Sequence, residues 1–425
     1  MHNYFARSGR KATESGWFVA CWMPIHVPYD SLPFLAGSSL QVILHWAMLL
    51  TVVVITALLS VSIFNLVRFA RLPKTFSHPD APGPSVAILI PARNEERCIE
   101  HCVRSVCAQT YPNVEVIVLN DGSTDATGDI LARLSSEYQH LQVIQGSPLP
   151  DGWVGKSWAC HQLSMATNAD VLVFTDADTV HQPDTISRSV AMLSQNGLSM
   201  FSMVPYQVLT SIGEHAVIPM VHVLYFSYLP NSLIMTNRRV SLSAANGQFM
   251  CFTREGYTSI GGHRAVWNSL VEDVFLARAM KGAGQKIALV DGTDAVSCHM
   301  YTGAREVTHG FSKNLFPATQ YNLPLTLLFL GHLMLTYVGP LISLPLGVHW
   351  SNTMIIAASS YALCAAGLIR FMISLRFRMP LWHCFLQPLT ALWTVGIGVN
   401  SIRWAYSRGG SQWKGRSYSR KGRSS

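Results

Sequence analysis

The chain has 425 residues, of which 49% are hydrophobic and 13% are charged, and it carries a net charge of +8 at pH 7. An ordinary soluble protein has about 25% charged residues, so this composition excludes a fully soluble protein and indicates a membrane protein with a soluble part. Basic residues gather beside the hydrophobic stretches and near the end of the chain. This distribution is typical of anchoring to anionic lipid, and we expect a lipid bilayer, and no nucleic acid, as a partner.

Four hydrophobic stretches are each long enough, at about 18 residues or more, to cross a bilayer. One lies near the start, at 40–69, and three follow the middle of the chain, at Leu325–Leu346, Met354–Phe371 and Leu381–Ile402. The basic residues after the first and third stretches place the region between them in the cytoplasm by the positive-inside rule. Three full C-terminal spans would then export the basic tail, so either the last stretch is re-entrant or interfacial, or the rule fails here.

The composition divides the chain into regions. In order they are an N-terminal arm (1–39), a transmembrane helix (40–69), a Pro-rich linker (70–84), a soluble domain (85–318), a membrane region with two to three hydrophobic spans (319–404) and a basic tail (405–425). The basic N-terminus is not followed closely by an apolar segment, so it does not resemble a cleaved signal peptide. The nine cysteines form no C-x-x-C pair, and we expect reduced thiols in a cytosolic domain.

Apolar runs alternate with helical patterns in the soluble region. The runs at 85–90, 114–119, 141–145 and 171–174 are typical of buried strands, and the segments between them have helical spacing. Asn94 stands where it would cap the first of these helices. The succession predicts an α/β domain with a mostly parallel sheet and helices on both faces. The strand ends then share one edge, which is where open α/β sheets bind ligands.

Polar turns follow the predicted strands. Asp176 and Asp178 come after the last of them, and two acids with this spacing can share one hard divalent cation that also holds a diphosphate. A solvated Asp pair at a turn is the alternative. Asp121 lies in a turn beside a helix N-terminus, where a base or ribose can be held. Lys156 opens a helix after a glycine-bearing turn and is suited to neutralising phosphate, although the spacing of an ATP-type phosphate loop is absent.

The segments PARNEE, NDGSTDAT, DGWVGKSWA and TDADT, in this order, resemble the family-2 inverting glycosyltransferases of the GT-A fold, a Rossmann-like α/β fold, over Val86–Phe316. The resemblance implies a nucleotide-sugar donor, a UDP-sugar, and a divalent cation, Mg²⁺ or Mn²⁺. It implies that Asp178 binds the cation. His299 is a second candidate ligand by its residue type, although a structural role is the more frequent one for a histidine. The residues it implies for binding the nucleotide-sugar are Pro91, Arg93, Glu95, Asp121, Lys156, Asp176 and Arg305.

Two later segments carry the same resemblance. Asn246, Gly247 and Gln248 are similar to the acceptor-side loop of the family, and Glu272 and Asp273 are similar to its catalytic ED motif. The resemblance makes Asp273 the general base, because a hydroxyl that attacks an anomeric carbon must lose its proton. The alternative for both acids is that they complement the dipole in the first turn of a helix.

Further features leave alternatives open. The Q-x-x-R-W signature of many processive relatives is absent, and Arg305 is left to supply its cation. A structural histidine is the alternative for His299. The segment Ile212–Met235 is rich in aromatic residues and broken by two prolines, so we expect an interfacial segment near the acceptor site, with buried core as the alternative.

The acceptor is inferred from resemblance alone. The region after EDVFLA is similar to bacterial carotenoid glycosyltransferases and, next, to ceramide glucosyltransferase-like and hopanoid-type enzymes. We therefore expect a membrane-bound inverting enzyme that moves one sugar to the hydroxyl or carboxylate of a lipid acceptor, a carotenoid or other terpenoid, at the cytoplasmic face of the cytoplasmic membrane. A polyprenyl-phosphate or polysaccharide glycosyltransferase is the alternative enzyme. A degenerate, non-enzymatic transferase would lack one of the acids of these motifs, and all of them are present.

Overall fold

The computed structural model describes residues 39–74, 83–407 and 411–418. Contacts divide the chain into two units, Met1–Ile43 and Leu44–Ser425, and the elements below belong to the second unit apart from the start of helix α1. Most of the predicted N-terminal arm, half of the predicted linker and the end of the predicted basic tail lie outside the described residues.

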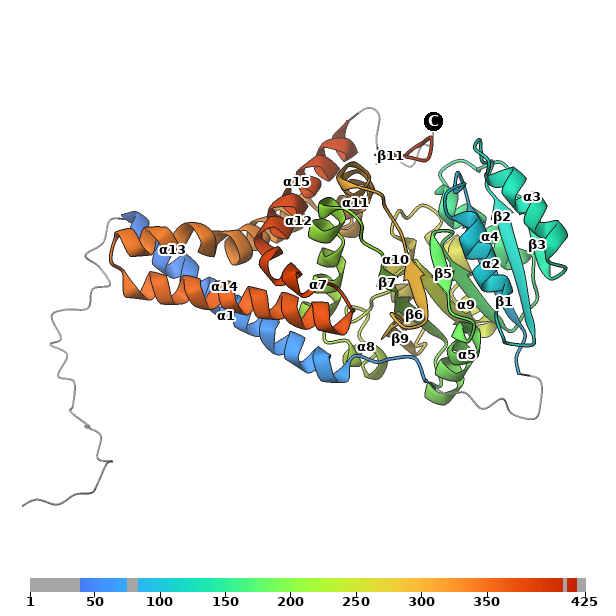
Figure 1. Ribbon diagram of the computed structural model, residues 1–425, viewed down its shortest axis with the longest axis horizontal. Helices are drawn as coiled ribbons and strands as arrows, with labels where there is room; N and C mark the ends of the chain where they lie inside the picture. Colours follow the sequence, from blue (N-terminus) through green and yellow to red (C-terminus); the bar gives the residue numbers. More distant parts are fainter. Residues whose placement is uncertain (1–38, 75–82, 408–410, 419–425) are drawn as a thin grey trace, which may run out of the picture. The chain divides into compact units, whose positions relative to one another are not determined.

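A seven-stranded sheet forms the centre of the soluble region (Figure 1). Its strands, in spatial order, are β3 (Leu141–Gln145), β2 (Val114–Asn120), β1 (Val86–Ala92), β4 (Val171–Thr175), β8 (Phe249–Thr253), β6 (Met200–Val204) and β9 (Ile287–Asp291). Only β8 is antiparallel to its neighbours. A second sheet has three strands, all of which follow β4 in the sequence: β5 (Thr179–His181), β10 (Val296–Cys298) and β7 (Tyr206–Gln207). The predicted α/β class with a mostly parallel sheet is confirmed.

Both faces of the central sheet are buried. Alternate residues of β1 enter two separate hydrophobic cores, Ala87 and Leu89 on one face and Ile88 and Ile90 on the other, as the two-residue period of a strand requires. The helices of this region are α2 (Ile99–Cys107), α3 (Thr127–Glu137), α4 (Gly155–Met165), α5 (Thr185–Asn196), α9 (Arg254–Ser259) and α10 (Glu272–Gly282). All cysteines among the described residues are free thiols, as their spacing predicted.

The predicted cap at Asn94 is wrong. Helix α2 begins only at Ile99, and Asn94 has a φ of 52° in the left-handed region. Its side-chain Oδ1 accepts a hydrogen bond from the backbone N–H of Thr124 at 2.8 Å, and its own N–H donates to Ser123 Oγ at 3.0 Å. Asn94 therefore joins the turns after β1 and β2, because this tertiary contact outweighs the local preference of asparagine for a helix start.

Three helical segments of the described residues are long and apolar enough to cross a membrane, namely Ser39–Arg68, Leu323–His349 and Thr353–Arg376. The first is α1 and the third is α14; the second is α12 (Leu323–Leu333), a π-helical turn (Met334–Val338) and α13 (Gly339–His349). Helices α13 and α14 pack together, and α1 contacts both (Figure 1): Thr56 shares a hydrogen bond with Tyr361, and Ser343 donates one to Met48.

The stretch Leu381–Ile402 is not one of these candidates. It forms a 3₁₀ turn (Leu381–Phe385) followed by α15 (Gln387–Tyr406), which packs against α11 (Ala304–Ala318) and α6 (Ile212–Val217). By length and composition, two segments after the soluble region can therefore cross a membrane among the described residues, where the sequence left two to three open.

The segment Ile212–Met235 is core. It forms α6, α7 (Pro219–Ser227) and α8 (Ser232–Thr236). On α7, Met220, Val223 and Phe226 are buried in the same hydrophobic core as residues of the sheet and of α14. For these residues the expected interfacial placement is wrong, and the alternative, buried core, is right. Pro219 is the first residue of α7, a position where proline is favoured, and Pro230 follows the end of α7.

Candidate active site

One cavity of about 820 Å³ opens at the C-terminal edge of the parallel strands. Its lining includes every residue that the sequence singled out, from all of the polar turns: Pro91, Arg93, Glu95, Asp121, Lys156, Asp176, Asp178, Asn246, Gly247, Gln248, Glu272, Asp273, His299 and Arg305. Segments more than 200 residues apart in the chain therefore meet at one site. The roles assigned to these residues remain predictions at this point, and their geometry bears on each.

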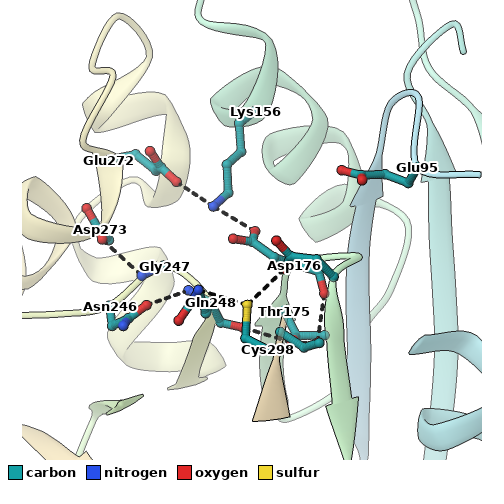
Figure 2. Close-up of polar contacts among 12 residues, drawn as sticks. Glu95, Lys156, Thr175, Asp176, Asn246, Gly247, Gln248, Glu272, Asp273 and Cys298 are labelled. Carbon is teal, nitrogen blue, oxygen red and sulfur yellow. Dashed lines mark hydrogen bonds and ion pairs between the residues drawn. The ribbon is translucent and has the colours of Figure 1, made fainter. Parts of the chain in front are cut away.

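Lys156 lies between two carboxylates (Figure 2). From the first turn of α4, its Nζ contacts Asp176 Oδ1 at 2.7 Å and Glu272 Oε1 at 3.0 Å. Burial works against the charge of Lys156, but the two carboxylates outweigh it and hold the pKa of this lysine well above its ordinary value. Burial likewise acts to raise the pKa of Glu272, and Lys156 reverses that effect and lowers it. Lys156 thus connects the turn after β4 to the start of α10 and keeps Glu272 ionised.

Asp273 is held by backbone donors. Its Oδ2 accepts the N–H of Gly247 at 2.9 Å, and its Oδ1 accepts the N–H of Val274 at 2.8 Å. A Cβ built on Gly247 would lie 3.1 Å from Lys156 Nζ and 3.4 Å from Asp273 Oδ2, so a larger residue here would require the end of the lysine side chain to shift by a few tenths of an ångström. Burial, and next the charge of Glu272, raise the pKa of Asp273 to about 6. A fixed carboxylate with a pKa close to neutrality has the properties of a general base.

Asp178 and His299 are joined through the backbone, and both line the cavity. The His299 N–H donates to the backbone oxygen of Asp178 at 3.1 Å, and Cys298 Sγ donates to Asp178 Oδ1 at 3.4 Å. Burial, reinforced by Asp176, raises the pKa of Asp178 to about 6. Nε2 of His299 is buried and has no hydrogen-bond partner.

These groups do not form a complete metal site by themselves. Within the described ranges, no group of three or more His, Cys, Asp or Glu side chains is arranged to hold a metal ion. Protein sites for Mg²⁺ commonly use one or two carboxylates and take further oxygen ligands from substrate phosphates. Asp178 and the unsatisfied nitrogen of His299 therefore fit a cation that is shared with a bound diphosphate.

Gln248 braces the turn that carries both aspartates. Its backbone oxygen accepts from Thr175 Oγ1 at 2.9 Å and from the N–H of Asp176 at 3.3 Å. Its side chain is buried, where Nε2 donates to Cys298 Sγ at 2.9 Å. Asn246 Oδ1 accepts the N–H of Gln248 at 3.0 Å. This loop reaches the cavity through Gly247, while the side chain of Gln248 points into the protein (Figure 2).

The turns after β1 and β2 are tied together beside the cavity. Arg93 donates from Nη1 to the backbone oxygens of Asp121 and Gly122, the latter at 3.1 Å. Burial raises the pKa of Glu95 to about 7, and Lys414 opposes the rise. The carboxylates of Glu95 and Asp121 are 22% and 8% exposed, so their environment is set by the groups that pair with them.

Those partners come from the tail of the chain, where no site residue was predicted. Lys414 forms an ion pair with Glu95, and Arg416 binds both oxygens of Asp121, with Nη2 to Oδ1 at 2.9 Å. The assignment of the whole basic tail to lipid anchoring is therefore wrong for these two residues. The available signal was weak, because a Lys-Gly pair between short runs is a poor indication of a hairpin compared with Asn-Gly.

Helix α11 presents basic residues to the cavity, and the sequence predicted only part of this face. Arg305, His309 and Lys313 are spaced by four residues and all line the cavity, as neighbours on one helix face do. Only Arg305 was predicted. Burial lowers the pKa of Lys313 to about 8. The i, i+4, i+8 spacing of basic residues was the signal that could have found this face.

Comparisons with known proteins agree with this fold. Residues 87–258 match the family described as Glycosyl transferase family 2. A 4,4'-diaponeurosporenoate glycosyltransferase of Staphylococcus haemolyticus (strain JCSC1435) is 27% identical over 242 residues, 54% of this chain and 61% of that protein. The enzyme of the same name from Staphylococcus aureus (strain USA300) is 27% identical over 347 residues, 79% of this chain and 88% of that protein. The chain thus spans less than two thirds of the first relative and most of the second.

A solved structure shares the fold. The mannosyltransferase PcManGT from Pyrobaculum calidifontis, solved in complex with GDP-Man and Mn²⁺, aligns with a TM-score of 0.52 at 17% identity, covering 86% of this chain and 100% of that one. The sheet, the cavity at its C-terminal edge and these similarities agree: the chain has a domain of the GT-A fold, in which residues 87–258 match glycosyl transferase family 2, and it is a glycosyltransferase.

Proposed function

We propose that this enzyme transfers one sugar, with inversion, from a nucleotide-sugar to a lipid acceptor at the cytoplasmic face of the membrane, and that the acceptor is a carotenoid or other terpenoid. The observation that carries the proposal is the placement of Asp273. This buried carboxylate is held by the N–H groups of Gly247 and Val274 and lies in the same cavity as Asp176 and Asp178. A base on one side and a phosphate-binding edge on the other are what an inverting displacement needs.

The reaction follows from this arrangement. An acceptor hydroxyl attacks the anomeric carbon from the side opposite the diphosphate, so the new C–O bond forms as the bond to the phosphate oxygen breaks. Asp273 takes the hydroxyl proton. A bound divalent cation would supply positive charge to the leaving diphosphate, held by Asp178 with His299. Lys156 holds Asp176 and Glu272 in place beside the reacting groups.

The lipid acceptor is supported by the membrane helices and by the relatives. Three segments of the described chain can cross a bilayer by length and composition, and α11, which lines the cavity, is followed directly by the first of the two C-terminal ones. Two relatives are named for a carotenoid acid. An apolar acceptor could therefore reach the cavity from the bilayer. The basic residues that flank α1 and end α14 support a cytoplasmic orientation.

The acceptor group distinguishes two versions of this function. A hydroxyl acceptor needs a base. We favour a hydroxyl acceptor because Asp273 has the position and the raised pKa of a general base. A carboxylate acceptor, with a pKa of about 4 to 5, is already deprotonated at neutral pH and needs none. Transfer that depends on the Asp273 carboxylate therefore indicates a hydroxyl acceptor, and transfer that does not depend on it indicates a carboxylate acceptor.

Mass spectrometry of membrane lipids from cells with and without this chain tests the proposal directly. We expect a new glycolipid, whose mass gives the sugar and acceptor together. Asp178→Asn and Asp273→Asn should each lower its formation by about 10³-fold or more, since each removes a group that acts on the transition state. Asp129→Asn, an exposed acid of α3 away from the cavity, is the matched control. Full activity of the Asp178→Asn variant, or a glycosylated polyprenyl phosphate in place of a terpenoid, contradicts the proposal.

A further inference from the structure

The chain ends, within the described residues, in a short hairpin that reaches the cavity. Strands β11 (Ser411–Trp413) and β12 (Arg416–Tyr418) pair antiparallel, and the two residues between them, Lys414 and Gly415, have φ values of 45° and 78°. Two left-handed residues are the signature of the tight turn that best fits a hairpin. Lysine rarely adopts this conformation, and such residues persist where surrounding contacts hold them, often at functional sites.

The contacts of the hairpin fix it against the nucleotide end of the cavity. Lys414 pairs with Glu95, Arg416 binds both oxygens of Asp121, and Arg93 Nε donates to the backbone oxygen of Lys414 at 3.0 Å. Strand β11 also contacts α11 and α15. The hairpin is thus held between the turns of the sheet edge and two helices of the later chain. Lys414 and Arg416 both line the cavity.

The charges of the cavity show why these two cations matter. Nine Asp and Glu side chains line it, against seven of Lys and Arg, and two of the seven come from the hairpin. Without the hairpin the lining would hold almost twice as many acids as Lys and Arg residues. The diphosphate of a nucleotide-sugar is an anion, and a cavity with such an excess of carboxylates repels it. Arg and Lys are the usual protein partners of phosphate.

The opposite possibility is that the hairpin competes with the donor for Glu95 and Asp121. The geometry does not favour it. A cavity of about 820 Å³ remains with the hairpin in place, and Lys156, Asp178 and Asp273 still line it. This is the size range, about 300 to 1,000 Å³, of small-molecule sites. The hairpin therefore borders the site and does not fill it.

We propose that the β11–β12 hairpin forms one wall of the donor site, in which Lys414 and Arg416 hold the diphosphate of the nucleotide-sugar. This inference rests on the proposed function, since it assigns further residues to the donor of that reaction. Glu95 and Asp121 then act on the donor through the hairpin, as positioning residues that anchor its two cations. The chain must also return to the catalytic side after α14, in keeping with two C-terminal spans.

Nucleotide binding to the full-length protein in detergent, with Mn²⁺ present, tests the inference. Titration calorimetry with UDP and with GDP identifies the nucleotide bound more tightly by the parent protein. For that nucleotide, Lys414→Gln and Arg416→Gln should each weaken binding by about tenfold, because each removes one charge-assisted phosphate contact. Binding of the corresponding nucleoside should change less than about twofold, because it has no phosphate. Arg403→Gln removes an exposed charge on α15 outside the cavity and is the control.

Each result has one meaning. Tighter or unchanged binding of the diphosphate by both variants overturns the inference, and so does an equal loss for the nucleoside. A parent protein that binds neither UDP nor GDP overturns the proposed function itself. The variants should elute from size exclusion as the parent does, so that a loss of binding is not a loss of folding.

The positioning role of Asp121 has its own readout. If Asp121 acts through Arg416, the double variant Asp121→Asn, Arg416→Gln should bind the diphosphate no more weakly than Arg416→Gln alone, because the pair is coupled. Independent contacts with the donor would instead give losses that multiply, and that result excludes the positioning role. Glu95→Gln with Lys414→Gln provides the same comparison for the second ion pair.

Discussion

The two walls of the cavity differ in charge and in construction. The sheet-edge wall consists of the turns after β1, β2 and β4 and the start of α10, and it carries the acids Glu95, Asp121, Asp176, Asp178, Glu272 and Asp273. A second wall, which we call the opposite wall for the sign of its charge, consists of α11 and the hairpin, and it carries Arg305, His309, Lys313, Lys414 and Arg416. The acids are short side chains in the turns after strands and at the start of α10, where Asp273 is fixed by two backbone N–H groups. The cations are long side chains that reach the cavity from a helix face and from the tail.

This difference shows how each wall keeps its charge. Burial raises the pKa of Asp178 and of Asp273 to about 6, so the acids depend on neighbouring cations to remain ionised. On the sheet-edge wall the neighbouring cation is Lys156, which contacts Asp176 and Glu272 directly. The opposite wall supplies its cations at the nucleotide end, through the hairpin. Removing single groups from either wall tests this division.

The largest effect is expected at Lys156. Replacing it by Met leaves Glu272, whose side chain is 7% exposed, and Asp176 without their shared cation. The acids of the sheet-edge wall then repel one another and the diphosphate. We expect kcat/KM to fall about 10²- to 10³-fold, the usual cost of losing one preorganised electrostatic contact. Steady-state kinetics with the nucleotide-sugar gives the value.

Lys286→Met is the matched control for this substitution. Lys286 Nζ donates to the backbone oxygen of Asn196 at 2.7 Å and does not line the cavity. The Lys286→Met substitution removes the same charge from the same domain, and it should leave kcat/KM within about twofold of the parent value, as exposed substitutions away from a site usually do. Equal losses in both variants would mean that the domain, and not the wall, had been disturbed.

The sheet-edge wall could be predicted because its signals are local. Asp176 and Asp178 follow a short apolar run that indicates a central strand, and the turn places both acids at the ligand-binding edge. The strand at 141–145 was predicted with the bounds that the structure has. Here the backbone of a few consecutive residues decides the position of the side chain.

The opposite wall could not be predicted, because its contacts are distant in the chain. Arg416 and Asp121 are separated by 295 residues, and no pattern near either residue indicates the other. Basic residues after a hydrophobic stretch have a simpler local explanation in lipid binding, which is why that explanation was preferred. The predicted helix cap at Asn94 was wrong for the same reason, because its side chain bonds to Thr124, 30 residues away, and not to the start of the helix.

A smaller effect is expected where the acids approach the backbone. Gly247→Ala places a Cβ 3.1 Å from Lys156 Nζ and 3.4 Å from Asp273 Oδ2. The lysine must give way and the bond from Gly247 N–H to Asp273 weakens, so we expect kcat to fall about tenfold, as small displacements of a catalytic group do. Gly282→Ala, at the end of the helix that carries Asp273, is the control, because a Cβ there meets nothing within 4 Å. A Gly247→Ala variant as active as the control would mean that this close approach is not needed.

The smallest effect, a shift in a pH profile, separates the roles of the two neighbouring acids. The pKa of Asp273 is raised to about 6 by burial and then by the charge of Glu272. A base must be deprotonated, so with a hydroxyl acceptor kcat should fall as the pH drops through about 6. Glu272→Gln removes one of the two causes, which lowers the pKa of Asp273 and moves the inflection to lower pH. Glu255→Gln, an exposed acid outside the cavity, should leave the inflection in place. A shift of the inflection to higher pH in the Glu272 variant would exclude Asp273 as the titrating base. A parent profile without any inflection near pH 6 would mean that the acceptor is a carboxylate, which reaches the enzyme already ionised.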